Sequence, residues 1–138
     1  MKLMGEALMF ENIPLLKASG LMAKHASLRQ RVISENIANS DTPNYAPRDI
    51  PKFGDVVRSQ AFSNFGETRR EGHFDFAELN KSYEAVESKD FEVKPNGNSV
   101  SIEIEVTKSI EVERQHSQAL AIYQHSIDLL KSSIGRGR

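Results

Sequence analysis

The chain has 138 residues, a formal charge of −1, 27% charged residues and no cysteine. This length suits one domain, or a pair of helices with an insert, and the balanced charge argues against a global nucleic-acid-binding surface and against an acidic solvating tail. Without cysteine there are no disulfides and no thiolate metal sites, and no apolar run approaches the roughly 20 residues that a membrane-spanning helix needs.

Residues 1–16 lack the features of a cleavable export signal. Glu6, Glu11 and Asn12 interrupt their apolar residues, and they have neither a basic start nor a continuous apolar stretch. On these features alone the chain is predicted to be cytosolic.

A first helix is predicted from Asn12, a favourable N-cap before Pro14, to about Asn39. At 100° per residue its apolar residues form two seams: Met22, Ala26, Ile33 and Ile37 in one, and Leu21, Leu28 and Val32 in the other. Three polar residues lie between the seams: His25, Arg29 and Asn36. A polar centre predicts that the helix touches at least two neighbours. Periodicity alone does not separate this from one ordinary core face with a satisfied His25 at its middle.

The first helix is expected to end at a sharp corner. Residues 39–44 place turn formers around Pro43, and the residue before a proline is disfavoured in the helical region. The run from Ser34 to Tyr45, S-E-N-I-A-N-S-D-T-P-N-Y, resembles the N-terminal signature of the flagellar axial proteins, which are the rod, hook and hook-associated subunits. Their pattern is roughly S-x-N-I-A-N-x-x-T-P-G-Y. Asn44 stands where glycine is usual, and asparagine tolerates positive φ better than most residues.

Other features place the resemblance nearest the proximal rod subunits of that family. These features are the short length, the tripeptide Asp41-Thr42-Pro43 and the sequence Arg48-Asp49-Ile50. The resemblance covers both ends of the chain, and the middle carries little of it.

Residues 42–100 are predicted to form an irregular insert between helical segments at 1–41 and 101–138. A short helix is expected at 53–57, packing Phe53 and either Val56 or Val57 on the main helices, and residues 59–89 have no assigned structure. Apolar residues alternate on both sides of Asn96-Gly97, which predicts a short β-hairpin near 91–106. In the resembled family the C-terminal helix begins near Ser101, so we expect this helix to be established between 101 and 107.

The C-terminal helix is predicted to continue without a break to residue 133 and to stop at Gly135. Mostly apolar residues recur on a seven-residue spacing in two series, each interrupted by one polar residue, Glu113 or His116. The series are Val106, Glu113, Leu120, Ile127 and Ile134, and beside them His116, Tyr123 and Leu130. Such a stripe stays on one partner only by left-handed supercoiling, so it predicts a coiled coil. Polar residues at 117, 124 and 131 make a lone two-stranded coil from this seam weak.

The sequence contains no recognisable catalytic, metal or cofactor site. None of its histidines, His25, His73, His116 and His125, pairs with another at a spacing of three or four residues. There is no glycine-rich phosphate loop, and the basic clusters at 69–70 and 135–138 are interpreted as solvated charge. We therefore expect no enzymatic activity, no cofactor and no metal.

Each terminal helix has an apolar face that one partner does not exhaust, which predicts a subunit that completes its core by assembly. The fold is expected to be mainly α. The resemblance implies that long N- and C-terminal helices form an antiparallel coiled-coil hairpin, with an irregular middle insert containing a short β-hairpin. It further implies a structural subunit of the proximal rod of the flagellar basal body, stacked into a helical tube that transmits torque and encloses the export channel.

The resemblance also implies the partners and the location. The partners are copies of the chain, other rod subunits, the adaptor between the membrane ring and the rod, and the flagellar export gate, with neither nucleic acid nor a membrane span. The location is the periplasmic side of the basal body, reached through the flagellum's own type III export without a cleaved signal, which overrides the cytosolic prediction. The alternatives are a sibling rod subunit, a soluble helical adaptor or chaperone, and a helical enzyme, for which the sequence offers no convergent polar pocket.

Two sets of residues are predicted to matter for this function. The corner motif comprises Asn36, Asn39, Asp41, Thr42, Pro43 and Tyr45. Packing within and between subunits is assigned to Leu21, Leu28, Val32, Ile33, Ile37, Leu120, Tyr123, Ile127, Leu130 and Ile134.

Overall fold

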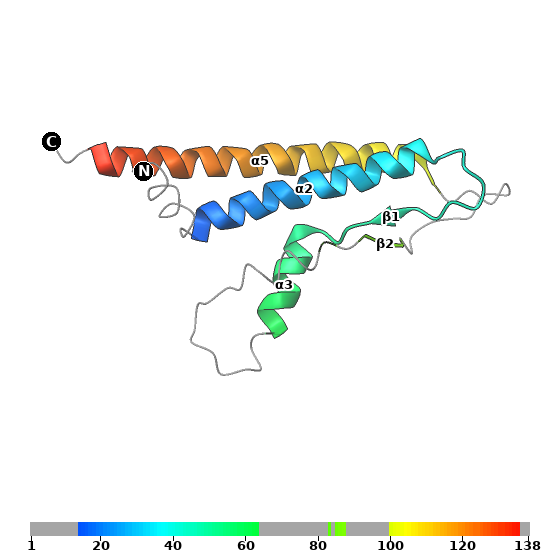
Figure 1. Cartoon of the computed structure of the whole chain (residues 1–138), viewed down its shortest axis with the longest axis horizontal. Helices are drawn as coiled ribbons and strands as arrows, with labels where there is room; N and C mark the ends of the chain where they lie inside the picture. Colours follow the sequence, from blue (N-terminus) through cyan, green and yellow to red (C-terminus); the bar gives the residue numbers. More distant parts are fainter. Residues whose placement is uncertain (1–13, 64–82, 84, 88–99, 136–138) are drawn as a thin grey trace, which may run out of the picture.

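Two long helices, α2 (Pro14–Ala38) and α5 (Ile102–Gly135), lie side by side in the computed structural model, which describes residues 14–63, 83, 85–87 and 100–135 (Figure 1). They run antiparallel, because Asn36 near the end of α2 bonds Glu105 in the first turn of α5. Between them in the chain come β1 (Arg48–Asp49), α3 (Phe53–Ser63) and β2 (Val86–Glu87). The prediction of a mainly helical fold with long terminal helices is confirmed.

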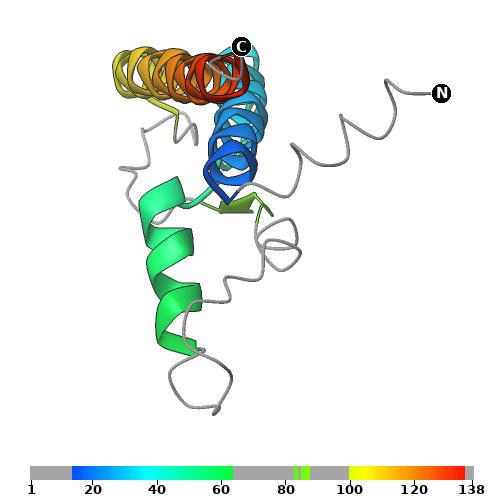
Figure 2. The ribbon, with the colours of Figure 1, turned by 90° about the vertical axis from the view of Figure 1, so that its left-hand side faces the viewer.

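The helix α2 has neighbours on two sides. On one side Ala26 and Ile33 of α2 form a buried core with Val112 of α5, and Ile37 packs against this core. On the other side α2 contacts β1 and α3. Figure 2 shows α2 lying between α5 and the layer that holds α3 and the two strands. The prediction that the first helix touches two neighbours is therefore confirmed, and both neighbours belong to the same chain.

The layer below α2 is built around a two-stranded antiparallel sheet. Asp49 pairs with Val86, and Arg48 pairs with Glu87. This pairing joins residues far apart in the chain and was not predicted, because strands of two residues leave no alternation to read.

A short helix was predicted at 53–57, and α3 confirms it. The helix continues to Ser63, into residues for which no structure had been assigned. The N–H groups of Asp55 and Val56 donate to the carbonyl of Lys52, which starts the helix. Val56 is buried, as predicted for one of the two valines.

The hairpin predicted near 91–106 is wrong in its second half, while residues 91–99 lie outside the described part. The chain is helical from Ile102, and the N–H of Glu105 donates to the carbonyl of Ser101 at 3.0 Å. Helical spacing puts Glu105 and Val112 on one buried face, and acidic residues in the first turn favour the helix dipole. These two gains outweigh the strand preference of the β-branched residues. The C-terminal helix therefore begins directly after Ser101, as the family resemblance implied.

The other helix ends agree closely with the predicted ones. Pro14 is the first described residue of α2, and Asn12, the predicted cap, lies outside the described residues. The helix α2 ends at Ala38 and α5 at Gly135. Among the described helices, none combines the length and the apolar character needed to cross a bilayer.

Candidate functional site

The inward face of α5 repeats every seven residues, as predicted, but one position earlier than predicted. The buried residues of this helix are Glu105, Val112, Ala119 and Ser126. The predicted series that starts at Val106 follows each of them by one residue. The face that packs on α2 is thus made of small and polar side chains rather than of the largest apolar ones.

The predicted packing residues of α5 therefore face outward or lie at the edge of the helix pair. The side chains of Leu120, Tyr123 and Ile134 are 50%, 42% and 66% exposed, and Ile127 and Leu130 are half-buried. Val106 is also exposed and lies in the same seven-residue series, separated from Leu120 by the exposed Glu113. We call this set the open stripe of α5: Val106, Leu120, Tyr123, Ile127, Leu130 and Ile134.

The predicted packing residues of α2 lie mostly inside. Val32 and Ile33 are buried, and Leu21, Leu28 and Ile37 are half-buried. The assignment of these residues to packing within the chain agrees with their positions, whereas their contacts between subunits remain a prediction.

Asn36 is the centre of the corner motif, and it uses all four of its hydrogen-bonding positions. Its Nδ2 donates to the Arg48 carbonyl at 2.7 Å and to Glu105 Oε2 at 2.9 Å. Its Oδ1 accepts from the Arg48 N–H at 3.0 Å and from the Tyr45 hydroxyl at 3.2 Å. Asn36 is fully buried. One side chain of α2 therefore fixes the returning strand β1 and the start of α5 together.

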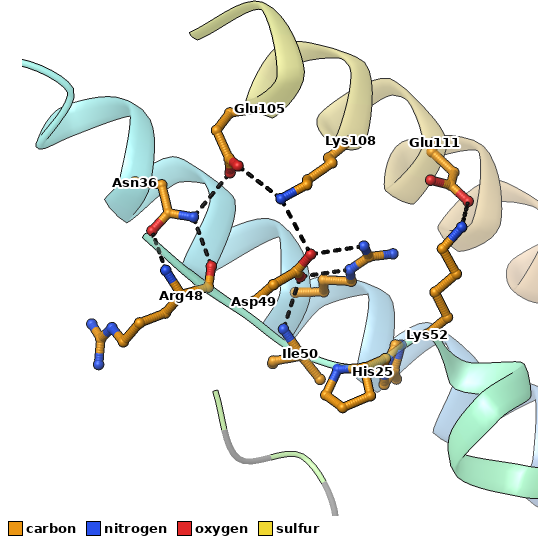
Figure 3. Close-up of polar contacts among 11 residues, drawn as sticks. His25, Asn36, Arg48, Asp49, Ile50, Lys52, Glu105, Lys108 and Glu111 are labelled. Atoms are coloured by element: carbon orange, nitrogen blue, oxygen red, sulfur yellow. Dashed lines mark hydrogen bonds and ion pairs between the residues drawn. The ribbon is translucent and has the colours of Figure 1, made fainter. Parts of the chain in front are cut away.

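A chain of charged groups continues from this amide (Figure 3). Arg29 holds both carboxylate oxygens of Asp49, through Nε to Oδ1 at 2.9 Å and Nη2 to Oδ2 at 3.0 Å. Lys108 of α5 bridges Asp49 Oδ2 at 3.5 Å and Glu105 Oε1 at 2.9 Å. The backbone N–H of Ile50 donates to Asp49 Oδ1 at 2.8 Å. These contacts tie α2, β1 and α5 to one another at a single place.

The groups around Asp49 and Arg29 determine the ionisation of these two side chains. Burial by itself raises the pKa of Asp49, but the hydrogen bond and charge of Arg29, the charge of Lys108 and the Ile50 N–H together bring this pKa below its ordinary value. The hydrogen bond from Asp49 raises the pKa of Arg29, against the effect of burial. Both groups are therefore charged at neutral pH.

The rest of the corner motif forms a capped turn. Asn39 Nδ2 donates to the Glu35 carbonyl at 2.8 Å, the N–H of Thr42 donates to the Asn39 carbonyl at 3.0 Å, and the N–H of Tyr45 donates to the Thr42 carbonyl at 3.3 Å. Asn44 has a φ of 59°, the left-handed conformation in which glycine is usual and asparagine is tolerated. The tip of the turn is exposed: Asp41, Thr42, Pro43 and Asn44. The motif thus has a buried half, which includes Asn36 and the Tyr45 hydroxyl contact, and an exposed tip.

Sequence reasoning missed part of this cluster. Arg29, Asp49, Glu105 and Lys108 were not assigned a role, although Arg29 lay between the two seams of α2. A charged residue on the apolar arc of a helix indicates a buried ion pair, but its partner is distant in the chain. Asp49 lies 20 residues from Arg29, and Glu105 lies 69 residues from Asn36. Among the described residues, no group of three or more side chains is arranged to hold a metal ion.

Comparison with known proteins gives matches of one kind. A family described as "Flagella basal body rod protein" matches residues 17–45, which comprise most of α2 and the corner motif. The chain is 26% identical over 113 residues to the flagellar basal body rod protein FlgB of Bacillus subtilis, covering 82% of this chain and 87% of that protein. It is also 26% identical over 107 residues to the protein of the same name from Agrobacterium fabrum, covering 75% of this chain and 80% of that protein.

Proposed function

We propose that this chain contacts other rod components through one exposed face of α5. The chain belongs to the flagellar basal body rod protein family, and it is a structural subunit of the rod rather than an enzyme. In this proposal the open stripe of α5 is the surface that packs against neighbouring subunits. The helix pair of segments 1–41 and 101–138 forms the wall of the assembly, and the insert 42–100 is carried on it.

The exposure of the open stripe supports the proposal. The helix α5 already packs on α2 through the series that begins at Glu105, so the stripe beside that series is a second apolar seam. Burying one large aliphatic side chain contributes about 1.5–3 kcal/mol. Large apolar side chains gathered on one exposed face are typical of a site of interaction.

The difference in length between the two helices supports it as well. The helix α5 has 34 residues and α2 has 25, which at about 1.5 Å per residue makes α5 longer by about 13 Å. Figure 1 shows the C-terminal end of α5 extending past the described start of α2. After Ser126 no described residue of α5 is buried, although Ile127, Leu130 and Ile134 follow. This end of the stripe is available to another subunit.

Membership in the rod protein family suggests how the subunits are arranged, where the assembly lies and what it contacts. We infer that the helix pairs supercoil and stack as coiled coils in a helical tube, since a heterologous contact that does not close generates a filament. The tube would belong to the proximal rod on the periplasmic side, transmit torque and enclose the export channel. Its partners would be copies of the chain, sibling rod subunits, the adaptor to the membrane ring and the export gate, and the chain would be exported without a cleaved signal.

Aspartate at Leu120 tests the open stripe. Because Leu120 is half exposed in the isolated subunit, Leu120→Asp is expected to keep the helix content and the midpoint of urea unfolding near those of the wild type. In the rod the same carboxylate would be buried without a partner, so we expect the loss of rod assembly and of swimming, with export of the subunit still detectable. Ile127→Asp is expected to act in the same way. Motility is scored in soft agar, and rods are scored in purified basal bodies.

The matched control is Ala121→Asp, which adds the same charge at the next residue, also exposed but outside the stripe. It is expected to assemble and swim better than Leu120→Asp. Normal swimming by Leu120→Asp and Ile127→Asp would contradict the role of the stripe.

One observation favours a second candidate, a soluble helical adaptor or chaperone. The polar cluster between α2, β1 and α5 is largely satisfied within one chain, as expected for a monomer that folds without siblings. Sedimentation over a wide concentration range distinguishes a rod subunit from an adaptor or chaperone. A monomer that neither self-associates nor binds sibling rod subunits would favour the adaptor.

A further inference from the structure

We propose that His25 is an acid-sensitive latch, whose neutral imidazole holds the start of α3 and Tyr83 against α2 and whose protonation releases them while the α2–α5 pair stays formed. This conformational role goes beyond a structural part in the rod and does not depend on it. It rests on the position of one histidine between three parts of the fold.

The geometry defines the protonation state of the docked ring. His25 is 0% exposed, and its Nε2 lies 2.8 Å from the carbonyl oxygen of Pro51. Because a carbonyl only accepts, Nε2 carries the hydrogen and donates it. In the neutral ring Nδ1 is then a bare acceptor, and this buried atom has no hydrogen-bond partner among the described residues. The tautomer follows from the Pro51 contact.

The same ring contacts two aromatic side chains below α2. Its centroid lies 5.5 Å from that of Phe53, the first residue of α3, and 5.1 Å from that of Tyr83 in an edge-on arrangement. Figure 3 shows His25 beside the stretch of chain between Ile50 and Lys52. The hydroxyl of Tyr83 is also buried and has no partner in the part of the chain that the structure describes. One imidazole therefore touches the strand-to-helix connection, α3 and the segment before β2.

Protonation would place a charge and a new donor where neither is compensated. Nδ1–H would have no acceptor in residues 14–63, 83, 85–87 and 100–135, and a buried donor without a partner is costly. Two charged groups act on the ring. The guanidinium of Arg29, one turn further along α2, disfavours the imidazolium, while the carboxylate of Asp49 on β1 favours it but is already bonded to Arg29 and Lys108. Phe53 of α3 brings no charge, and Tyr83 is neutral at these pH values because burial raises its pKa.

The direction of the pH effect follows. Burial, with a smaller effect from Arg29, lowers the pKa of docked His25 below its ordinary value of 6.5, against the opposing effects of the Pro51 carbonyl and Asp49. A released imidazole binds its proton more tightly than the docked one, so docking is strongest above about pH 6.5 and weakens as the pH falls towards the lowered pKa. The Asp49 carboxylate protonates only below its ordinary value of 3.8. Between these limits α3 and Tyr83 should detach from α2 while β1 stays bonded to α2 through the polar cluster.

The test is hydrogen exchange of the backbone amides in the full chain, corrected for the intrinsic rate, at about pH 7 and about pH 5, together with a titration of the histidine ring protons by NMR. From about pH 7 to about pH 5, we expect the exchange rate of the α3 amides from Val56 to Ser59 to rise. The rise should be about tenfold for each pH unit between the pKa of released His25 and that of docked His25. The amides around Val112 should stay protected. The ring protons of His25 should titrate at the same midpoint as the amide signals of α3.

Two variants complete the test. His25→Gln keeps an N–H donor for the Pro51 carbonyl but does not titrate, so exchange in α3 should no longer depend on pH beyond the intrinsic rate. His125→Gln removes an exposed histidine of α5 and should leave the wild-type dependence intact. Should His25→Gln not fold, the coincidence of the two midpoints in the wild type decides. The proposal is overturned by a His25 that titrates at or above 6.5, by midpoints that differ, or by a His25→Gln protein that keeps the wild-type pH dependence.

Discussion

Asn36→Asp is expected to lower the free energy of unfolding by about 3–5 kcal/mol near neutral pH, as removal of a partner from a buried polar pair does. The substitution changes the shape of the side chain very little. It replaces the amide that donates to the Arg48 carbonyl and to Glu105 Oε2 by an oxygen that repels both. The loss is read from the midpoint of urea unfolding, followed by circular dichroism at 222 nm, and it should shrink in acid as one carboxyl takes up a proton.

The second variant in this experiment restores the missing donor from the other side. Glu105→Gln in the Asn36→Asp background gives position 105 an amide that donates to the new carboxylate, and its Oε1 still accepts from Lys108. We expect a large part of the stability to return, but not all, because the Arg48 carbonyl still faces an oxygen. If Asn36→Asp unfolds at the wild-type midpoint, the amide does not hold the corner and α5 together.

Asp49→Ala is expected to cost about 3–5 kcal/mol, because it leaves the guanidinium of Arg29 buried and without a counter-charge. The side chain of Arg29 is 4% exposed and that of Asp49 is 20% exposed. In the wild type, the stability that comes from the lowered pKa of Asp49 is present above about pH 4 and is lost as the pH falls through that lowered value. Asp49→Ala should lack this part of the acid dependence. Urea unfolding at several pH values measures both effects.

A surface ion pair of the same length provides the matched control. Arg48 and Glu35 are also joined at 2.9 Å, but their side chains are 47% and 40% exposed, so Glu35→Ala is expected to cost no more than about 1 kcal/mol. Adding Arg29→Met to Asp49→Ala removes the stranded charge and should recover part of the loss. Equal losses for Glu35→Ala and Asp49→Ala would show that burial does not set the strength of these pairs.

The residues between the seams of α2 explain how much of the fold could be predicted from the sequence. His25, Arg29 and Asn36 occupy the centre of the apolar arc, and this pattern correctly indicated two neighbours. It did not indicate what those neighbours were, because each polar residue bonds a partner distant in the chain, such as Pro51, Asp49 or Glu105. Period and polarity are local properties of the sequence, whereas the choice of a partner depends on the folded chain.

The helix α5 shows the same limit in another way. A seven-residue period is present, but the series beginning at Val106 was assigned to packing both within and between subunits. The inner face consists instead of Glu105, Val112, Ala119 and Ser126. Hydropathy ranks this face low because it includes a carboxylate and a hydroxyl. The carboxylate is buried because Asn36 and Lys108 satisfy it, and Ser126 Oγ donates to the Ile122 carbonyl within the helix. The larger apolar residues are then left outside, where a neighbouring subunit is proposed to cover them.

Cysteine labelling at the open stripe tests this central claim most directly. Because the chain has no cysteine, Leu120→Cys introduces a single thiol at a position that is half exposed in the isolated subunit. A maleimide is expected to label this thiol rapidly in the purified monomer and at least tenfold more slowly in intact basal bodies, where about 1.4 kcal/mol of protection corresponds to a factor of ten. Equal labelling rates in the monomer and in the assembled rod would contradict it.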